Sequence, residues 1–334
     1  MDNRNNPMKK ILITGANGYI GAKMSLLFSE NNNLVSTHCF PNIPNNEQWV
    51  KAMNKIEVGD LRSEEVIDKL TDNQYDVVIH LVSLDHHQSD GTPDFVASVN
   101  VMPIWNLLEK FSIKKTLKKF IYFSTFQVYG NAAFKEISEE FIPSPKNKYG
   151  LTHLLSENIC NHYNLTSNIN CINVRLTNSY GSPIFDDSNC WWLVINDLCK
   201  TAYTKKAIQL HSDGSPQRDF IHSSDIYKAI EILVNTNEKI LHKNTFNISS
   251  GETLTILELA HMVKSIYKKR YDYDIHISLP NGNNSKSPEK YIKSKRYIVN
   301  NNKLKSLGFE PKTDLETGIN EIFEYLEGLH NAKY

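Results

Sequence analysis

The sequence has little of what marks a secreted, membrane-spanning or nucleic-acid-binding protein. Its 334 residues contain five cysteines, an odd number with no Cys-x-x-Cys pair, which argues against a disulfide framework or a structural zinc site. The formal net charge is zero, so no excess charge draws the chain to nucleic acid or to an anionic membrane. No apolar run reaches the roughly 18 residues that span a bilayer, and the polar start MDNRNNPMKK lacks a signal-peptide core. We therefore expect a cytoplasmic protein with reduced thiols and no membrane or nucleic-acid partner.

Apolar segments alternate with helical ones through the first half of the chain. Strands are expected at residues 11–13, 34–40, 55–60, 75–84, 118–125 and 171–178, and helices lie between most of them. The run YDVVIHLVSL is apolar almost throughout, which suits a strand buried on both faces of a parallel sheet. This alternation predicts an α/β fold of the Rossmann type, with a doubly wound parallel sheet.

The second half of the chain is less regular. Helices are expected at residues 191–206, 225–235 and 255–269, strands at 207–215, 245–250 and 272–280, and a polar loop at 281–290. The sequence has no internal repeat and no long linker. The second half is therefore expected to pack directly on the first.

Three glycines lie between the first strand and the first helix. Gly15, Gly18 and Gly21 form the pattern G-x-x-G-x-x-G. Glycines in this context permit a tight turn and let a pyrophosphate approach the backbone, and the free N–H groups at the helix start hold the phosphates. A glycine triplet also occurs in purely structural turns. Its position at the start of a β–α alternation favours nucleotide binding.

The end of the second strand normally distinguishes NAD from NADP. A carboxylate there accepts from the ribose hydroxyls, and a nearby arginine suits a 2′-phosphate. LVSTHCFPN has neither, because His38 or Cys39 takes the place, and the missing arginine favours NAD. Asp60, in VGDLR, is a candidate acceptor for the adenine amino group. The alternative is that Asp60 caps the helix that begins at SEEV.

A series of motifs extends over nearly the whole chain in a specific order. They are GANGYIG, VGDLR, HLVS, FSTFQVYGN, KYGLTH, VRLTNSYGSP, GSPQRDFIHSSDI, FNISSGETLTILELA and LGFEP. In this order they resemble the extended short-chain dehydrogenase/reductase family, and within it the NAD-dependent nucleotide-sugar epimerases and dehydratases. The resemblance implies a Rossmann-type domain for NAD and a smaller C-terminal lobe for a nucleotide-diphosphate sugar. It also implies oxidation of a sugar hydroxyl, usually at C4, by hydride transfer to the nicotinamide.

The resemblance assigns roles to individual residues. It implies that Thr125 orients the sugar hydroxyl, that Tyr149 takes its proton, and that His153 replaces the family lysine that holds the nicotinamide ribose. The implied cofactor contacts are Gly15, Asn17, Gly18, Tyr19, Ile20, Gly21, Asp60, Leu61, Leu81, Val82, Ser83, Asn100, Ser124, Tyr149 and His153. The implied substrate contacts are His86, Thr125, Asn178, Arg218 and Lys295, and no metal is expected.

Tyr149, His153 and Glu157 in KYGLTHLLSE lie on one face of the expected helix. A phenol with a pKa near 10 is a poor base at neutral pH, and a nearby cation favours the phenolate. Lysine supplies a permanent charge, whereas histidine, with an ordinary pKa of about 6.5, supplies it only partly near pH 7. We expect a less activated tyrosine and a rate shifted to higher pH. The alternative is a protein without catalysis that binds NAD and a sugar nucleotide as a regulator or partner subunit.

Two further features of the sequence limit the types of reaction and site that are expected. Phe126 and Gln127 follow Thr125, where the 4,6-dehydratases carry carboxylates, and neither can act as an acid or base. Loss of water is therefore not expected, although plain packing beside the site explains the pair equally well. His86 and His87 have no evident third partner, which argues against a metal site. His86 remains a candidate contact with the sugar or a substitute for the missing lysine charge.

Several polar and aromatic residues of the second half match positions near the sugar nucleotide. By resemblance, Asn178 and Arg218 lie near its diphosphate, which a planar guanidinium binds with two hydrogen bonds. The alternative for Arg218 is a salt bridge between lobes. Either Lys295 or the adjacent Arg296 corresponds to a further family arginine. The pair at positions 191–192, two tryptophans, either stacks on the ligand or belongs to a core.

These observations predict two lobes and a dimer. Residues 8–180, joined by 219–250, are expected to form the NAD-binding domain, and residues 181–218 with 251–334 the lobe for the nucleotide sugar. The family often dimerises through four helices, here those after Asn100 and at Tyr149, so a homodimer or higher homo-oligomer is expected. The leading reaction is hydride transfer at sugar C4, as an epimerase, dehydrogenase or reductase, in the synthesis of a surface polysaccharide such as a capsule.

Overall fold

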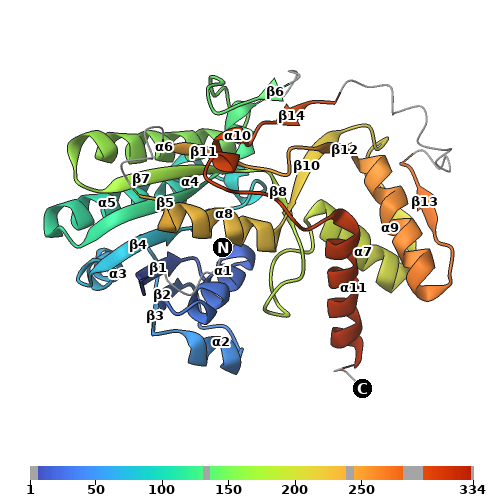
Figure 1. Cartoon of the computed structure of the whole chain (residues 1–334), viewed down its shortest axis with the longest axis horizontal. Helices are drawn as coiled ribbons and strands as arrows, with labels where there is room; N and C mark the ends of the chain where they lie inside the picture. Colours follow the sequence, from blue (N-terminus) through green and yellow to red (C-terminus); the bar gives the residue numbers. More distant parts are fainter. Residues whose placement is uncertain (1–6, 131–135, 238–243, 281–295, 332–334) are drawn as a thin grey trace.

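The centre of the protein is a sheet of parallel strands. The computed structural model describes residues 7–130, 136–237, 244–280 and 296–331 (Figure 1). The sheet has seven strands in the order β11-β7-β5-β4-β1-β2-β3. Their bounds are β1 Lys10–Thr14, β2 Leu34–Cys39, β3 Lys55–Val58, β4 Tyr75–His80, β5 Leu117–Thr125, β7 Asn170–Leu176 and β11 Thr245–Ile248. This order confirms the predicted doubly wound α/β fold.

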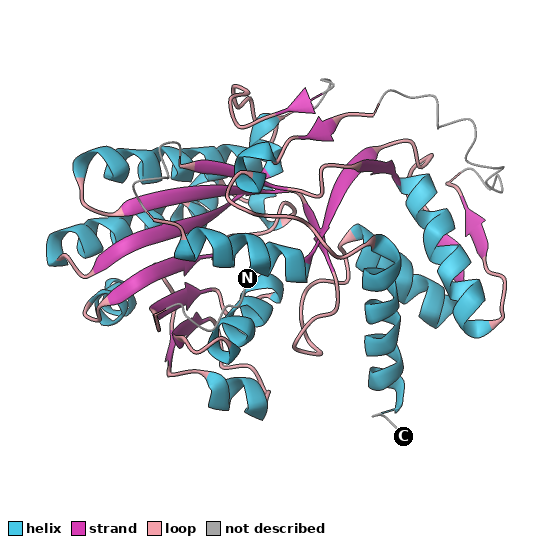
Figure 2. Cartoon of the chain, in the orientation of Figure 1, coloured by secondary structure: helices cyan, strands magenta, loops and turns pink. Residues whose placement is uncertain are grey.

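Helices cover both faces of the sheet because successive strand residues point to opposite sides. Ile11 and Ile13 of β1 pack into one core, and Leu12 packs into another. The first core takes residues from α1 (Tyr19–Glu30), α2 (Glu47–Ala52) and α8 (Ser223–Asn235). The second takes residues from α3 (Glu64–Thr71), α5 (Met102–Lys114) and α6 (Lys148–Thr166). Figure 2 shows the magenta strands of the sheet between these helices.

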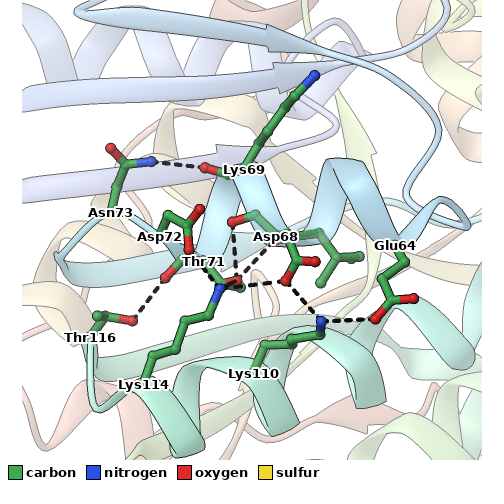
Figure 3. A network of polar contacts seen from close by, with 10 residues as sticks. Glu64, Asp68, Lys69, Thr71, Asp72, Asn73, Lys110, Lys114 and Thr116 are labelled. Carbon is green, nitrogen blue, oxygen red and sulfur yellow. Dashed lines mark hydrogen bonds and ion pairs between the residues drawn. The ribbon is translucent and has the colours of Figure 1, made fainter.

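Ion pairs link two helices on the outside of the second layer. Lys110 and Lys114 of α5 approach Glu64 and Asp68 of α3 and Asp72 just after it, at N–O distances from 2.7 to 3.5 Å (Figure 3). The three carboxylate side chains are each more than 40% exposed. Exposed pairs of this kind contribute little to stability.

Three helices pack around a separate core at the other end of the molecule (Figure 1). They are α7 (Val194–Lys205), α9 (Ile256–Tyr271) and α11 (Leu315–Asn331), with the strand pair β9 (Ala207–Gln209) and β13 (His276–Ser278). A small sheet of β8 (Asn178–Tyr180), β10 (Gln217–His222) and β12 (Thr253–Thr255) lies between this core and the main sheet. The remaining described elements are α4 (Pro93–Asn100), β6 (Glu136–Ile137) paired with β14 (Ile298–Val299), α10 (Asn302–Lys305), and two short 3-10 helices at Gln88–Asp90 and Phe126–Tyr129.

The structure corrects several predicted boundaries. The expected strand over residues 75–84 ends at His80, because the apolar residues that follow form a loop. The helix expected from residue 191 begins at Val194. Strand β10 and helix α11 had no predicted counterpart, and β10 has only a short apolar segment, Phe220–Ile221, to signal it. The polar loop predicted at 281–290 lies outside the described residues. No helix in the described ranges is long and apolar enough to cross a membrane.

Candidate active site

A cleft of about 1190 Å³ opens at the carboxyl ends of four sheet strands. The segments that follow β1, β4, β5 and β7 line it on one side. Residues from later in the chain, including Trp192, Arg218 and Arg296, complete its lining. Ligands of doubly wound folds bind outside the carboxyl ends of the strands, and a cleft of this size accommodates large ligands.

The cleft brings together most of the residues singled out from the sequence. Those that line it are Gly15, Gly18, Tyr19, Ile20, Gly21, Leu81, Ser83, His86, Ser124, Thr125, Tyr149, Asn178 and Arg218. Six of the predicted contacts are not among its lining residues, namely Asn17, Asp60, Leu61, Val82, Asn100 and His153. Lys295 lies outside the described residues. Sequence reasoning missed Lys146 and Asn147, which line the cleft just before Tyr149 and whose only signal was that position.

The glycine loop has the close backbone packing that a pyrophosphate site needs. Gly15 has a φ of +71°, and a Cβ atom at Gly21 would lie 2.3 Å from the Gly15 carbonyl oxygen. Helix α1 begins after Gly18, which provides no side chain to cap the first N–H groups. These groups can therefore bind an anion, and the loop fits the diphosphate of NAD.

The structure excludes one of the two roles considered for Asp60, the helix cap. Asp60 does not cap α3, since the N-cap is Ser63. Its carboxylate instead accepts hydrogen bonds from the Arg62 side chain. These hydrogen bonds are the main reason that the pKa of Asp60 is lowered. At the end of β2, His38 is buried and its Nε2 lies 2.7 Å from the Gly59 carbonyl oxygen. The side chain of Asn17 donates to the Phe40 carbonyl, so it joins the glycine loop to β2.

Thr125 and Tyr149 lie side by side in the cleft. Thr125 ends β5, and Tyr149 is in the first turn of α6, whose start is fixed by the Asn147 side chain accepting from the Gly150 N–H at 2.8 Å. Burial raises the pKa of Tyr149 to about 12, partly opposed by its hydrogen bond with the Thr125 side chain. The nearby negative charge of Asp85 raises this pKa further. The pair has the geometry to hydrogen-bond one hydroxyl group of a bound ligand.

His153 carries no positive charge in this structure. It is only 2% exposed, and burial lowers its pKa to about 3. Its Nδ1 lies 2.6 Å from the Tyr122 hydroxyl, and its Nε2 lies 3.1 Å from Ser83 Oγ. The expectation of partial protonation near pH 7 is therefore wrong, because the ring lies in the core without a carboxylate among these partners. A direct bond to a ribose would require one of the two contacts to break.

Glu157, the third member of the predicted helix face, supports the site from behind. Its carboxylate accepts from Arg175 at 3.0 and 2.6 Å and from the Ser124 hydroxyl at 2.5 Å. Arg175 also lies over the ring of Tyr129, 4.7 Å from its centroid. The buried ion pair therefore fixes the strand residue that precedes Thr125.

The side chains of the two residues after Thr125 make a ring contact and a hydrogen bond. The Phe126 ring is nearly parallel to that of Tyr297, with centroids 6.0 Å apart. The Gln127 side chain accepts from Asn147 Nδ2 at 2.7 Å. Neither observation supplies an acid or a base.

Aromatic rings form the far wall of the cleft. The ring of His86 lies 3.9 Å from that of His87 and 5.2 Å from that of Trp192, measured between centroids. Burial, and then the charge of His87, lower the pKa of His86, so it does not replace the lysine charge at neutral pH. Trp191 instead packs against the core of the second lobe. No group of three or more metal-ligating side chains occurs in the described part of the chain.

Two arginines face the cleft from the second lobe. Arg218 is exposed at the start of β10, and Asn178 beside it donates to the Asp219 carbonyl oxygen at 2.9 Å. Arg296 pairs with Glu258, whose other oxygen accepts from Thr255 in the capping box at the start of α9. Of the two adjacent basic residues predicted for this position, Arg296 lines the cleft and Lys295 lies outside the described residues.

Comparisons with known proteins agree with this geometry. A profile of the NAD dependent epimerase/dehydratase family matches residues 11–249. The chain belongs to this family. Members of this family are NAD-dependent.

Individual relatives are distant but match along almost the full length. The chain is 24% identical to a putative UDP-glucose 4-epimerase of Methanocaldococcus jannaschii, over 95% of this chain and 98% of the relative. It is 22% identical to the low-salt glycan biosynthesis protein Agl12 of Haloferax volcanii, over 95% and 98%. The crystal structure of UDP-glucuronic acid 4-epimerase from Bacillus cereus with UDP-glucuronic acid and NAD superposes with a TM-score of 0.75 at 24% identity, over 96% of this chain and 99% of that one. The structural likeness confirms the fold.

Proposed function

We propose that this family member transfers a hydride at C4 of a nucleotide-diphosphate sugar, as a 4-epimerase, a dehydrogenase or a reductase. The observation that supports this most is the pairing of Tyr149 with Thr125 in a cleft that has the glycine loop on one side and Arg218 on the other. A hydroxyl group bound there meets a proton acceptor and a hydrogen-bond partner at once.

In the proposed chemistry the sugar loses a proton from the C4 hydroxyl oxygen and a hydride from C4 itself. Tyr149, as the phenolate, takes the proton from the oxygen, and Thr125 holds that oxygen by a hydrogen bond. Bound NAD would supply the acceptor for the hydride of C4, and the sugar would be left as a 4-ketone. In an epimerase the hydride returns to the opposite face, and Tyr149 gives the proton back. In a dehydrogenase the 4-keto sugar is released.

The second lobe is proposed to hold the nucleotide diphosphate. Arg218 and Arg296 face the cleft and can each bind phosphate oxygens. We propose Asn178 as a further contact, and the division into residues 8–180 with 219–250 and 181–218 with 251–334 as the two binding lobes. Phe126 and Gln127 argue against water elimination. The glycan role in the name of the Haloferax volcanii relative supports a place in surface polysaccharide synthesis, and five free, buried cysteines support a reducing compartment such as the cytoplasm.

A homodimer is proposed through α5 and α6. Four large apolar side chains of these helices are 43 to 50% exposed, although other residues of both helices are buried in the core. They are Met102, Trp105, Leu151 and Leu155. Association of two copies through this surface would bury them.

A second candidate function is binding of NAD and a sugar nucleotide without turnover. It is favoured by the neutral His153 and by the Tyr149 pKa of about 12, because both leave little phenolate at neutral pH. Incubation with NAD and a panel of nucleotide sugars, followed by chromatography and mass spectrometry, separates the two. Tyr149→Phe is the matched control.

The outcomes of this experiment are distinct. A product lighter by two hydrogens identifies a dehydrogenase, and an isomer of unchanged mass identifies an epimerase. Loss of water would contradict the argument from Phe126 and Gln127. No product across the panel, with NAD and a sugar nucleotide both shown to bind, would replace the enzyme by the binding protein.

A further inference from the structure

A series of polar contacts leads from the cleft into the core through Ser83, His153 and Tyr122. Ser83 follows β4 and lines the cleft. His153 lies behind it on α6, and Tyr122 on β5 is 1% exposed. The series therefore occupies the space between the cleft wall and the sheet, at the position where the family has its lysine.

The hydrogen-bond partners define where each proton lies. The Ser83 hydroxyl is 2.9 Å from the Leu84 carbonyl oxygen, which can only accept, so its single proton points there. Ser83 Oγ must then accept at its contact with His153, which requires a proton on Nε2. The neutral ring consequently has a bare Nδ1, and the Tyr122 hydroxyl donates to it. One neutral tautomer satisfies all three contacts.

The surroundings of His153 disfavour the charged ring. Its ring stacks against Tyr122, with centroids 5.7 Å apart, and meets the edge of Tyr149 at 4.5 Å. Burial opposes protonation of this ring as it does for the buried His80 at the end of β4, whose pKa burial lowers to about 3. Without an anionic partner at hydrogen-bond distance, a buried imidazolium is unfavourable.

We propose that Tyr122 is a positioning residue that holds His153 in the Nε2–H tautomer and thereby makes Ser83 Oγ an acceptor for a hydroxyl group of the nicotinamide ribose. The inference rests on the proposed function of the cleft. The direction of the hydrogen bond with the ribose would be the reverse of that made by the family lysine, because a lysine can only donate. Ser83 keeps one lone pair for the ribose, since its proton and its other lone pair are already engaged.

The tautomer can be measured directly in the protein without NAD. Nitrogen-15 NMR of histidine-labelled protein at pH 7, with His153 assigned by its disappearance in His153→Gln, should show neutral His153 protonated at Nε2. An Nδ1–H tautomer or a charged ring would overturn the proposal. This result does not depend on catalysis or on NAD binding.

Two tyrosine variants separate positioning from packing. Tyr122→Phe removes the donor to Nδ1 and should produce a mixture of His153 tautomers. Tyr163→Phe is the matched control, because Tyr163 is also buried but donates to Glu109 instead. His153 should stay Nε2–H in that control. An unchanged tautomer in folded Tyr122→Phe would show that Tyr122 only fills space.

NAD titration by calorimetry tests whether Ser83, at the cleft end of this series of polar contacts, binds the cofactor. Ser83→Ala should weaken binding about fivefold, the size of one hydrogen bond. Tyr122→Phe should weaken it less, and the double variant no more than Ser83→Ala alone, because both act on one contact. Additive losses would overturn the coupling. If the wild-type protein binds no NAD at all, the proposed function fails, while the NMR result still decides the tautomer.

Discussion

Two polar residues lie one turn apart on α6, and the protein treats them in opposite ways. Glu157 and His153 are each 2% exposed. Glu157 forms a two-bond ion pair with Arg175, and that hydrogen bonding raises the pKa of Arg175 against the effect of burial. His153 contacts two hydroxyl groups and the backbone of Phe123, none of them ionised, and burial lowers its pKa to about 3. A buried group keeps its charge where a counter-ion meets it and loses it where none does.

The comparison bears on the active site because both residues support it. Glu157 fixes Ser124 next to Thr125, and His153 contacts Tyr149 and Ser83. The family lysine would bring a cation to the position of His153. Here that charge is absent, so the base must be activated without it.

The largest effect is expected from breaking the buried ion pair. Glu157→Gln leaves the Arg175 guanidinium buried without a counter-charge, and should cost about 3 kcal/mol of unfolding free energy. Urea unfolding measures this. A loss below about 1 kcal/mol would show that Arg175 finds another partner or water.

Placing a positive charge at position 153 should change the pH dependence of the catalytic rate. His153→Lys supplies a cation beside Tyr149 and should lower the pKa of Tyr149 from about 12, so that activity rises at lower pH. A tyrosine pKa that is lower by one gives about tenfold more phenolate at neutral pH. The pH dependence of kcat, measured from pH 6 to 10, should therefore move to lower pH by about one to two pH units. His153→Met is the uncharged control, and an equal displacement in both variants would rule out the charge as the cause.

A neutral substitute should preserve the behaviour of His153. The amide of glutamine has one donor and one acceptor end, as the neutral imidazole does. His153→Gln should therefore keep the pH dependence of kcat within about half a pH unit. A displacement to higher pH by a full pH unit or more would mean that the wild-type ring is charged during turnover.

The smallest effect is expected from the exposed ion pairs between α3 and α5 (Figure 3). Lys110→Met removes contacts with Glu64 and Asp68, all of them open to solvent. The urea midpoint should not change measurably at physiological salt, and any change should shrink further as salt is added. A change as large as that of Glu157→Gln would contradict the distinction between buried and exposed pairs.

The sequence by itself determined the fold and the parts of the site that are local along the chain. The alternation of strands and helices indicated the parallel sheet, because a strand buried on both faces is apolar throughout. The glycine spacing located the phosphate loop, and a four-residue spacing placed Tyr149, His153 and Glu157 on one helix face, as α6 has them. These signals depend on neighbours in sequence.

Only the tertiary structure decided the charge of His153, its link to Ser83 and Tyr122, and that Arg296 reaches the cleft. Ser83 is 70 residues from His153 in sequence, and Tyr122 is 31 residues away. A pKa depends on burial and on the partners that folding brings to a side chain. An isolated motif therefore indicates that a histidine replaces a lysine, but the packing of α6 on β4 and β5 determines what that histidine can do.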